Sequence, residues 1–249
     1  MNDQEKMPFL AHLEELRKRL IASAIAVGIG FAICYCFSER LFQILIEPLK
    51  AAMPEGDHLV FTALPELFVT YLKVALVGGV LLAAPFLFYE MWMFVAPGLY
   101  RHEKKMAIPF VTSSTLLFVG GALFGYFIVF PFGFKFFMGF SNEYVKALPS
   151  AMEYFSFSLK LLFAFGMVFE LPVFIFFLTK LGIVTTDNLK KNRKYAILGA
   201  FIVAAIVTPP DVVSQFMMSG PLIVLYEIGI IVSMFAKKKK AQEKVQPEF

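Results

Sequence analysis

Residues 67–96 have the sequence LFVTYLKVALVGGVLLAAPFLFYEMWMFVA, and this stretch determines the class of fold. A helix needs about 20 mostly apolar residues to cross the roughly 30 Å hydrocarbon core of a membrane. The stretch exceeds this length and contains only two charged residues, Lys73 and Glu90. It therefore predicts a membrane-spanning helix rather than a helix of a water-soluble domain.

Five further apolar windows extend this prediction to an all-α, polytopic membrane protein with six transmembrane helices. The chain is 59% hydrophobic, whereas soluble domains are roughly 45–50% apolar. At ~1.5 Å per residue the fifth window reaches only about 20 Å, and polar residues and a proline interrupt the sixth, so the last two helices are expected to be short. The six windows are 20–37, 67–96, 107–133, 154–178, 195–207 and 212–235.

Outside the apolar windows no stretch is long enough to build a core of its own, so residues 1–236 are expected to form one membrane domain. Its first part, 1–19, is expected to be a cytoplasmic amphipathic helix that leads into the first span. Residues 237–249 are rich in lysine and are expected to form a disordered basic cytoplasmic tail near anionic lipid headgroups. The apolar stripe of the N-terminal helix consists of Phe9, Leu13, Leu16 and Leu20.

The distribution of Lys and Arg predicts that the N-terminus and the C-terminus both lie in the cytoplasm. Loops on the cytoplasmic side of a membrane carry an excess of these residues. The N-terminal segment, the second loop, the fourth loop and the tail carry four, three, five and five of them, or 17 in total, whereas the opposite loops carry four. On this topology the first loop, 38–66, lies outside and is expected to hold short surface helices.

The usual signatures of an enzyme, a metal site or a cofactor site are missing from the sequence. The three histidines, His12, His58 and His102, do not have the spacing of metal ligands. The chain has no glycine loop that could cradle a phosphate, no GxSxG and no CxxC. It also has no basic stripe with interleaved aromatic residues, so a nucleic acid is not expected as a partner. We therefore predict a protein that is not an enzyme and has no cofactor.

Glu170 is the most informative ionisable residue within the predicted spans. A carboxylate at the centre of a membrane helix costs roughly 2.5–3.5 kcal/mol or more, so it is expected to face protein or a water-filled cavity. Pro172 follows two residues later and predicts a kink, because proline leaves a helix carbonyl without its partner. The alternative is a carboxyl group that is protonated or extends to the cytoplasmic edge. Lys73 and Lys160 lie nearer the outer ends and are expected to extend toward the headgroups.

The second cytoplasmic loop and the N-terminal helix together suggest an acidic site. Residues 94–105, FVAPGLYRHEKK, contain a Pro-Gly turn followed by the carboxylate Glu103. The N-terminal helix presents Glu14 and Glu15 on the same side of the membrane. Because each carboxylate can bind a guanidinium through two hydrogen bonds, these residues could bind a cationic partner. The alternative is that the loop only anchors the chain through its positive charges.

Four strings of residues resemble the TatC family in content and order. The resemblance covers about 7–235, and four motifs in the same order are not produced by membrane composition alone. The strings are HLEELRKR at 12–19, FVAPGLYRHE at 94–103, FGMVFELP at 165–172 and TPPD at 208–211.

The resemblance implies a receptor subunit of the twin-arginine translocase in the bacterial inner membrane. Such a protein would bind the twin-arginine signal peptides of folded preproteins and organise their export, driven by the proton motive force. The implied partners are TatA- and TatB-type single-spanning subunits, further copies of the chain, and membrane lipids. The residues implied for signal-peptide binding are Glu15, Glu103, Phe94, Arg17 and Pro48. The implied intramembrane carboxylate is Glu170, and the implied contacts with partner subunits are Asp211 and Gln215.

A proton-coupled transporter of small solutes is the alternative from another functional class. In that protein Glu170 and Glu227 would relay protons, and the kinked helices would form a gate. Transporters of this kind often contain two repeated halves, and no convincing copy of the first three spans occurs in the last three. The short last two helices also make a central cavity difficult to enclose, so the translocase subunit is the preferred interpretation.

Overall fold

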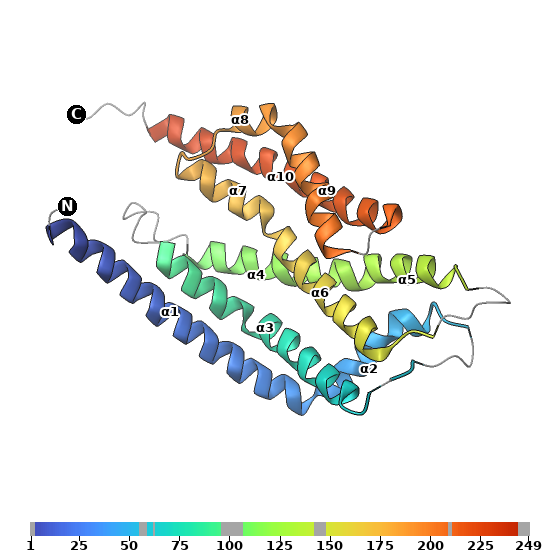
Figure 1. Ribbon diagram of the computed structural model, residues 1–249. Coiled ribbons are helices and arrows are strands. Elements are labelled where there is room, and N and C mark those ends of the chain that lie inside the picture. Colours follow the sequence, from blue (N-terminus) through green and yellow to red (C-terminus); the bar gives the residue numbers. More distant parts are fainter. Residues whose placement is uncertain are drawn as a thin grey trace, which may run out of the picture. The chain divides into compact units, whose positions relative to one another are not determined.

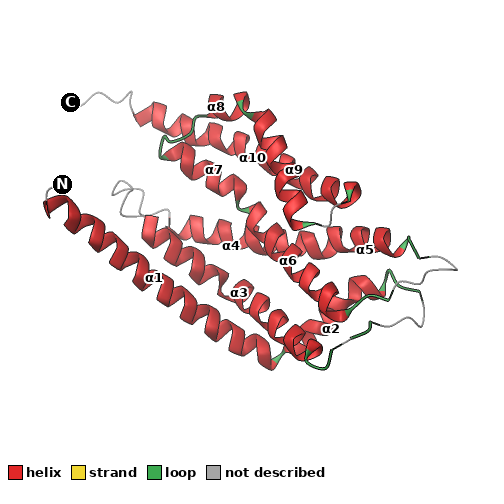
Figure 2. Ribbon diagram, in the orientation of Figure 1, coloured by secondary structure: helices red, strands yellow, loops and turns green. Residues whose placement is uncertain are grey.

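The computed structural model describes residues 3–54, 59–61, 63–95, 107–141, 148–208 and 211–243, with side chains described from residue 12 to residue 236 within these ranges, except at residue 95. Helices account for nearly all of this part of the chain (Figure 2). The strand-type pairing found there is a single isolated bridge between Val60 and Ser150. The prediction of an all-α fold is confirmed.

The predicted membrane spans are present as helices. Five helical segments are long and apolar enough to cross a membrane, and the 15-residue helix α9 (Arg193–Val207) corresponds to the short fifth window. The five segments are His12–Cys36, Glu66–Phe94, Ala107–Met138, Ala151–Lys180 and Val212–Ala236. The six-helix prediction agrees with this arrangement, and the fifth helix is short as expected. The sixth was also expected to be short, and this is wrong, because the helix continues through Gln215, Pro221 and Glu227 and its apolar segment Val212–Ala236 has 25 residues.

The chain divides into two compact units that alternate along the sequence. Unit 1 comprises Met1–Ile46, Val60–Leu116 and Ser150–Ser156, and unit 2 comprises Glu47–Leu59, Leu117–Pro149 and Phe157–Phe249. Each unit is built mainly from helices that pack along one another. A single domain over residues 1–236 stays a prediction.

In unit 1, α1 (Asp3–Cys36) and α3 (Glu66–Val95) lie side by side and antiparallel (Figure 1). Their backbones approach closely at Gly30 and Gly79, where a Cβ on Gly30 would lie 2.5 Å from the Gly79 carbonyl oxygen. Small residues permit such close crossings between membrane helices. Glycine is therefore required at this contact, and the contact sets the register of the two helices.

Helix α1 runs without a break through both the expected amphipathic segment and the first span. The sequence analysis describes these as a segment at 1–19 followed by a helix at 20–37. Neither glycine nor proline occurs between Phe9 and Val27, so nothing in this stretch interrupts the helical hydrogen bonds. The helix therefore carries its N-terminal carboxylates as a rigid extension of the span.

The first loop contains the helix α2 (Ser38–Lys50), as predicted, with Pro48 inside it. Within unit 1 the Tyr154 hydroxyl donates a hydrogen bond to the Leu45 carbonyl oxygen at 2.6 Å. The Phe42 ring stacks on Phe155 with ring centroids 4.3 Å apart. These contacts attach the start of α2 to the start of α6 (Ala151–Phe169).

Two of the long spans in the sequence are each divided into successive helices. The third consists of α4 (Ala107–Phe124), a π-helical turn at Gly125–Val129 and α5 (Phe130–Met138). The fourth consists of α6 and α7 (Leu171–Lys180), which are separated at Glu170. In unit 2 a Cβ on Gly121 would lie 2.4 Å from the Phe165 carbonyl oxygen, so α4 and α6 also cross at backbone distance.

The C-terminal part of unit 2 is formed by α7, α8 (Thr186–Lys191), α9 and α10 (Val212–Glu243), which Figure 1 shows in orange and red. The Tyr226 hydroxyl donates to the Leu189 carbonyl oxygen at 2.8 Å, and the Ser233 hydroxyl donates to Thr186 Oγ1 at 2.9 Å. The short helix α8 is absent from the sequence predictions. The backbone of α10 stays helical to Glu243, past residue 237 where the disordered tail was expected to begin.

Candidate functional site

Arg19 of α1 binds two carboxylates at once, one from its own helix and one from α3. Its Nη2 donates to Glu15 Oε1 at 3.0 Å, and its Nη1 donates to Glu90 Oε2 at 2.8 Å. Hydrogen bonds between charged groups are roughly twice as strong as neutral ones. The Arg19 guanidinium therefore joins two carboxylates into a cluster of three charged groups. We call it the acidic cluster (Glu15, Arg19 and Glu90).

The positions of these residues in the sequence explain why they meet. Glu15 and Arg19 are four residues apart, so they face the same side of α1. Arg19 lies 11 residues before Gly30, and Glu90 lies 11 residues after Gly79. Because the helices run antiparallel and touch at the two glycines, equal spacings bring Arg19 opposite Glu90.

Burial differs between the two carboxylates. The Glu90 side chain is 11% exposed, whereas the Glu15 side chain is 32% exposed, and the Arg19 side chain between them is 22% exposed. A buried carboxylate without a cation is strongly unfavourable, so Arg19 compensates Glu90 more than it compensates Glu15. With both carboxylates ionised, the cluster keeps one net negative charge.

Phe94 lies close to the N-terminal helix through a contact with His12. The two rings are stacked, with centroids 4.4 Å apart and an interplanar angle of 18°. His12 precedes Glu15 by three residues, which is about one helical turn. The structure thus brings Phe94 near the acidic cluster within unit 1, as a shared signal-peptide site would require.

The remaining sequence-predicted residues of this site are not part of the acidic cluster that the structure describes. Arg17 is exposed on α1, and Glu14 faces away with Lys18, to which it is paired at 3.1 Å. Pro48 is buried in α2 and belongs to unit 2. Glu103 lies outside the described residues.

The spacing of Glu15 and Arg19 predicts the ion pair that the structure contains, but sequence reasoning missed the contact of Arg19 with Glu90. Glu90, near the inner end of its span, was expected only to help make the cytoplasmic face acidic. Two patterns were visible in the sequence. Glu15 and Arg19 have a favourable spacing, and Glu90 lies within an apolar stretch, where a carboxylate needs a cation. Neither signal says which cation reaches Glu90, because that depends on the contact between α1 and α3.

A second buried carboxylate, Glu66, lies at the opposite end of α3 and was also missed. It accepts hydrogen bonds from the Ser150 hydroxyl at 2.7 Å, the Met152 amide at 2.9 Å and the Ala63 amide at 3.3 Å. All of these donors are neutral. Glu66 therefore connects the segment before α3 with the segment before α6, and we call this arrangement the Glu66 clasp (Glu66, Ala63, Ser150 and Met152).

Glu170 separates α6 from α7, so the predicted interruption of the fourth span is confirmed. Its amide donates to the Met167 carbonyl oxygen at 3.2 Å, and its own carbonyl oxygen accepts from the Phe174 amide at 2.9 Å. Pro172 occupies the first turn of α7, where its missing N–H costs least. Glu170 itself is half-buried.

Asp211 caps the N-terminus of α10. Its Oδ1 accepts from the Ser214 amide at 2.7 Å, and its carbonyl oxygen accepts from the Gln215 amide at 3.2 Å. Such caps contribute about 1 kcal/mol to helix stability. This structural role of Asp211 accompanies the predicted contact of Asp211 and Gln215 with partner subunits, which stays a prediction.

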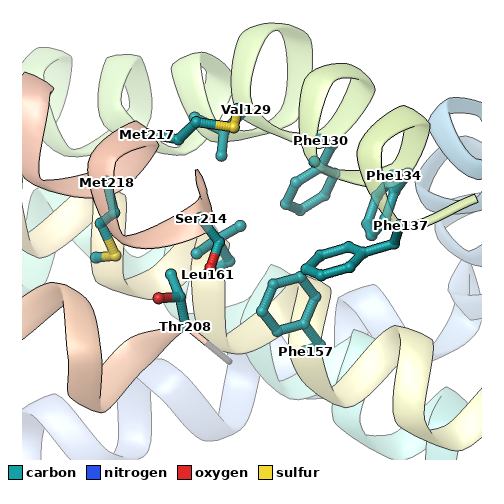
Figure 3. Close-up of a pocket in the computed structure, with 11 residues that line it drawn as sticks. Val129, Phe130, Phe134, Phe137, Phe157, Leu161, Thr208, Ser214, Met217 and Met218 are labelled. Atoms are coloured by element: carbon teal, nitrogen blue, oxygen red, sulfur yellow. The ribbon is translucent and has the colours of Figure 1, made fainter. Parts of the chain in front are cut away.

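A small cavity lies beside this cap in unit 2 (Figure 3). Aromatic residues of α5 and α6 line one side, and Thr208, Ser214 and Met218 line the other. Its volume of about 20 Å³ is close to the space that one water molecule needs. A cavity of this volume is too small to be a solute-binding site. The Thr208 hydroxyl at its edge already donates to the Ala204 carbonyl oxygen at 2.9 Å.

Other intramembrane charges are engaged in local contacts. Lys73 Nζ donates to Ser156 Oγ at 2.8 Å, and Lys160 Nζ donates to the Ile206 carbonyl oxygen at 2.8 Å. Glu227 pairs with Arg193 at 2.7 Å. Within the described ranges, no group of three or more His, Cys, Asp or Glu side chains could hold a metal ion.

Comparison with known proteins identifies close relatives. A family model described as Sec-independent protein translocase protein (TatC) matches residues 11–221. A Sec-independent protein translocase protein TatC from Desulforapulum autotrophicum is 58% identical over 247 residues, which cover 99% of this chain and 92% of the relative. The Escherichia coli protein of the same name is 38% identical over 235 residues, which cover 94% of this chain and 91% of the relative.

A solved structure also matches over most of the chain. The crystal structure of a twin arginine translocase receptor, TatC, superposes with a TM-score of 0.81 at 42% sequence identity. The match covers 91% of this chain and 99% of that chain.

Proposed function

Because the chain belongs to the TatC family of Sec-independent protein translocase components, we propose that it is the subunit that binds twin-arginine signal peptides of folded preproteins. It is a multi-pass protein of the bacterial inner membrane. In this proposal it organises export of the bound preprotein across that membrane, and the proton motive force supplies the energy.

The observation that supports this proposal most directly is the guanidinium already bound to Glu15. Arg19 Nη2 donates to Glu15 Oε1 at 3.0 Å, so a guanidinium nitrogen already binds one oxygen of this carboxylate. Arginine presents a planar fork of donors, whereas lysine presents a compact and strongly hydrated charge. A partly exposed carboxylate that already binds a guanidinium is therefore suited to distinguish an Arg-Arg pair from a Lys-Lys pair.

Several further residues belong to the proposed site. The exposed His12 ring and the Phe94 ring form an aromatic surface about one turn from Glu15. Glu103 would supply the second carboxylate for the second arginine of the pair. Arg17 and Pro48 would support the site without binding the peptide arginines.

The proposal also includes an orientation and a set of partners. Both termini and the acidic cluster would lie in the cytoplasm, in agreement with the excess of Lys and Arg in the loops of that side. TatA- and TatB-type subunits and further copies of the chain would join it in the complex, with Asp211 and Gln215 near their contacts. Single cysteines near residues 104 and 190 should resist an impermeant thiol reagent added outside the cell, and labelling there would contradict the orientation.

Peptide binding tests the proposed function. The affinities of a synthetic Arg-Arg signal peptide and of its Lys-Lys counterpart would be measured on the full chain in detergent or nanodiscs. Charge-assisted hydrogen bonds contribute roughly 1.5–3 kcal/mol each, so Glu15→Ala and Glu103→Ala should each weaken binding of the Arg-Arg peptide by about tenfold or more. The Lys-Lys peptide should lose much less. An Arg-over-Lys preference that survives both substitutions would contradict the assignment.

A further inference from the structure

We propose that Arg19 is an internal occupant of the signal-peptide site, which an incoming arginine displaces from Glu15 while Glu90 keeps hold of Arg19. The inference rests on the proposed function and adds two residues to it. Arg19 would determine specificity by competing with the peptide for Glu15. Glu90 would be a positioning residue that keeps Arg19 bound after Arg19 leaves Glu15.

The first step of the argument is chemical identity. The group that binds Glu15 in the structure is a guanidinium, which is also the group that the proposed ligand carries. A carboxylate binds a guanidinium most strongly when both of its oxygens accept, and one oxygen of Glu15, Oε1, already accepts from Arg19 Nη2 at 3.0 Å. A peptide arginine that binds Glu15 through both oxygens therefore competes with Arg19 for Oε1.

The second step concerns which contact of Arg19 breaks. Glu15 is about three times as exposed as Glu90, with side-chain exposures of 32% and 11%. An incoming peptide from solution reaches the more exposed carboxylate first. Loss of the cation would be costly for the buried carboxylate and much less so for the exposed one. The exchange therefore takes place at Glu15, and the contact between Arg19 and Glu90 persists.

The third step concerns charge. With both carboxylates ionised, the acidic cluster has one net negative charge before the peptide binds. One peptide guanidinium brings the cluster to two carboxylates and two cations, so each carboxylate then has a cation of its own. Neither state leaves the buried Glu90 without a partner.

Competition by Arg19 also sharpens the choice between arginine and lysine. A ligand succeeds only if its contact with Glu15 is better than the one that Arg19 already makes. Arg19 binds one oxygen of Glu15. A peptide guanidinium can exceed that contact by binding both oxygens, whereas a lysine ammonium offers no planar fork and is more strongly hydrated. Discrimination of this kind works by penalising the wrong ligand rather than by adding contacts to the right one.

The decisive experiment uses the double variant Arg19→Gln/Glu90→Gln, which removes the competitor and its holder together. The cluster keeps one net negative charge, so any change in peptide affinity does not come from net charge. We expect the Arg-Arg peptide to bind about fivefold to tenfold tighter than to the natural chain, because Glu15 no longer loses a charge-assisted bond when the peptide arrives. The Lys-Lys peptide should gain more, so that the Arg-over-Lys preference falls.

Single variants test the same exchange with opposite expected signs. Glu90→Gln alone frees Arg19 to stay on Glu15, so the Arg-Arg peptide should bind several-fold more weakly. Arg19→Lys keeps all the charges but replaces the fork that bridges both carboxylates, so the peptide should bind tighter, as in the double variant. The matched control is Glu14→Gln/Lys18→Gln, which removes an exposed pair with the same spacing on another face of α1 and should leave both affinities unchanged.

The outcomes distinguish failure of this inference from failure of the proposed function. If the natural chain shows no Arg-over-Lys preference and Glu15→Ala binds as well as the natural chain, the proposed function is wrong. If the natural chain prefers the Arg-Arg peptide and Glu15→Ala weakens binding, but the double variant and Arg19→Lys bind no more tightly, Arg19 is not a competitor. If the double variant does not fold, Arg19→Lys alone decides in the same way.

Discussion

The two ends of helix α3 hold buried carboxylates in different ways. Glu66, at the first turn, is 4% exposed and is surrounded by neutral donors from the segments before α3 and α6. Glu90, near the last turn, is buried as well and is held by Arg19, a cation that Glu90 shares with Glu15. The same residue type on the same helix thus has two different environments.

The two carboxylates differ in whether their hydrogen-bond donors are fixed or can move to another acceptor. The donors of the Glu66 clasp are a hydroxyl and backbone amides at fixed positions, and moving them would require the two segments to separate. The donor of Glu90 is a long side chain that can rotate between two acceptors. We therefore expect substitutions in the Glu66 clasp to affect mainly stability, and substitutions in the acidic cluster to affect peptide binding as well as stability.

Glu66→Ala should produce the largest loss of stability. It leaves several buried donors without an acceptor, and each such loss costs about 1–3 kcal/mol, so the free energy of unfolding should fall by about 3 kcal/mol or more. Thermal unfolding of the purified chain in detergent measures the effect. Glu66→Gln keeps one carbonyl acceptor and should lose less. An unchanged unfolding midpoint for Glu66→Ala would remove the distinction between the two ends of α3.

Arg19→Ala should rank second, because it leaves Glu90 buried without its cation. The residues are partly exposed, which reduces the cost to about 2 kcal/mol. Adding Glu90→Gln removes the uncompensated charge, so the double variant should be more stable than Arg19→Ala alone. The same unfolding assay applies. A double variant less stable than the single one would show that Glu90 does not depend on Arg19 for charge compensation.

Glu15→Ala should change stability by less than about 1 kcal/mol, since Glu15 is partly exposed and Arg19 keeps its contact with Glu90. The same variant is expected to lose peptide affinity by about tenfold or more. Unfolding and peptide titration on one preparation would separate the two effects. A large loss of stability would place Glu15 with Glu66 as a structural residue.

Glu14→Gln/Lys18→Gln should have the smallest effect. The pair is well exposed, with side-chain exposures of 56% and 70%, and exposed pairs of this spacing contribute about 0.3–0.5 kcal/mol. Its unfolding midpoint should match that of the natural chain within error. A shift as large as that of Arg19→Ala would show that ion pairs on α1 act on stability wherever they lie.

The sequence predicts the spans of this protein well because length and apolar composition are local properties. The windows at 67–96 and 154–178 correspond closely to α3 and to α6 with α7. The interruption at Glu170 was also predictable, since Pro172 restricts the backbone on its own. The cap made by Asp211 follows a recognisable pattern, an aspartate directly before an apolar helical segment, although the sequence analysis did not use it.

The contacts of the candidate site were less predictable because they depend on how two helices align. The spacing of Glu15 and Arg19 is visible in one helix, whereas the contact of Arg19 with Glu90 needs the register of α1 against α3. The Glu66 clasp likewise joins residues more than 80 positions apart. No periodicity within either segment encodes those distances.

The close contact of Gly30 with Gly79 is a point about which α1 could tilt against α3, and we call it the fulcrum. At ~1.5 Å per residue, Glu15 lies about 22 Å from this fulcrum and Arg19 about 16 Å from it. A tilt of about 5° at the fulcrum would therefore move Arg19 by roughly 1.4 Å, which is enough to break a hydrogen bond to Glu90. A methyl group added at either glycine would force the backbones apart at the fulcrum itself. If Glu15 binds a peptide as proposed, its position would thus depend on two glycines that lie about four helical turns away along α1 and α3.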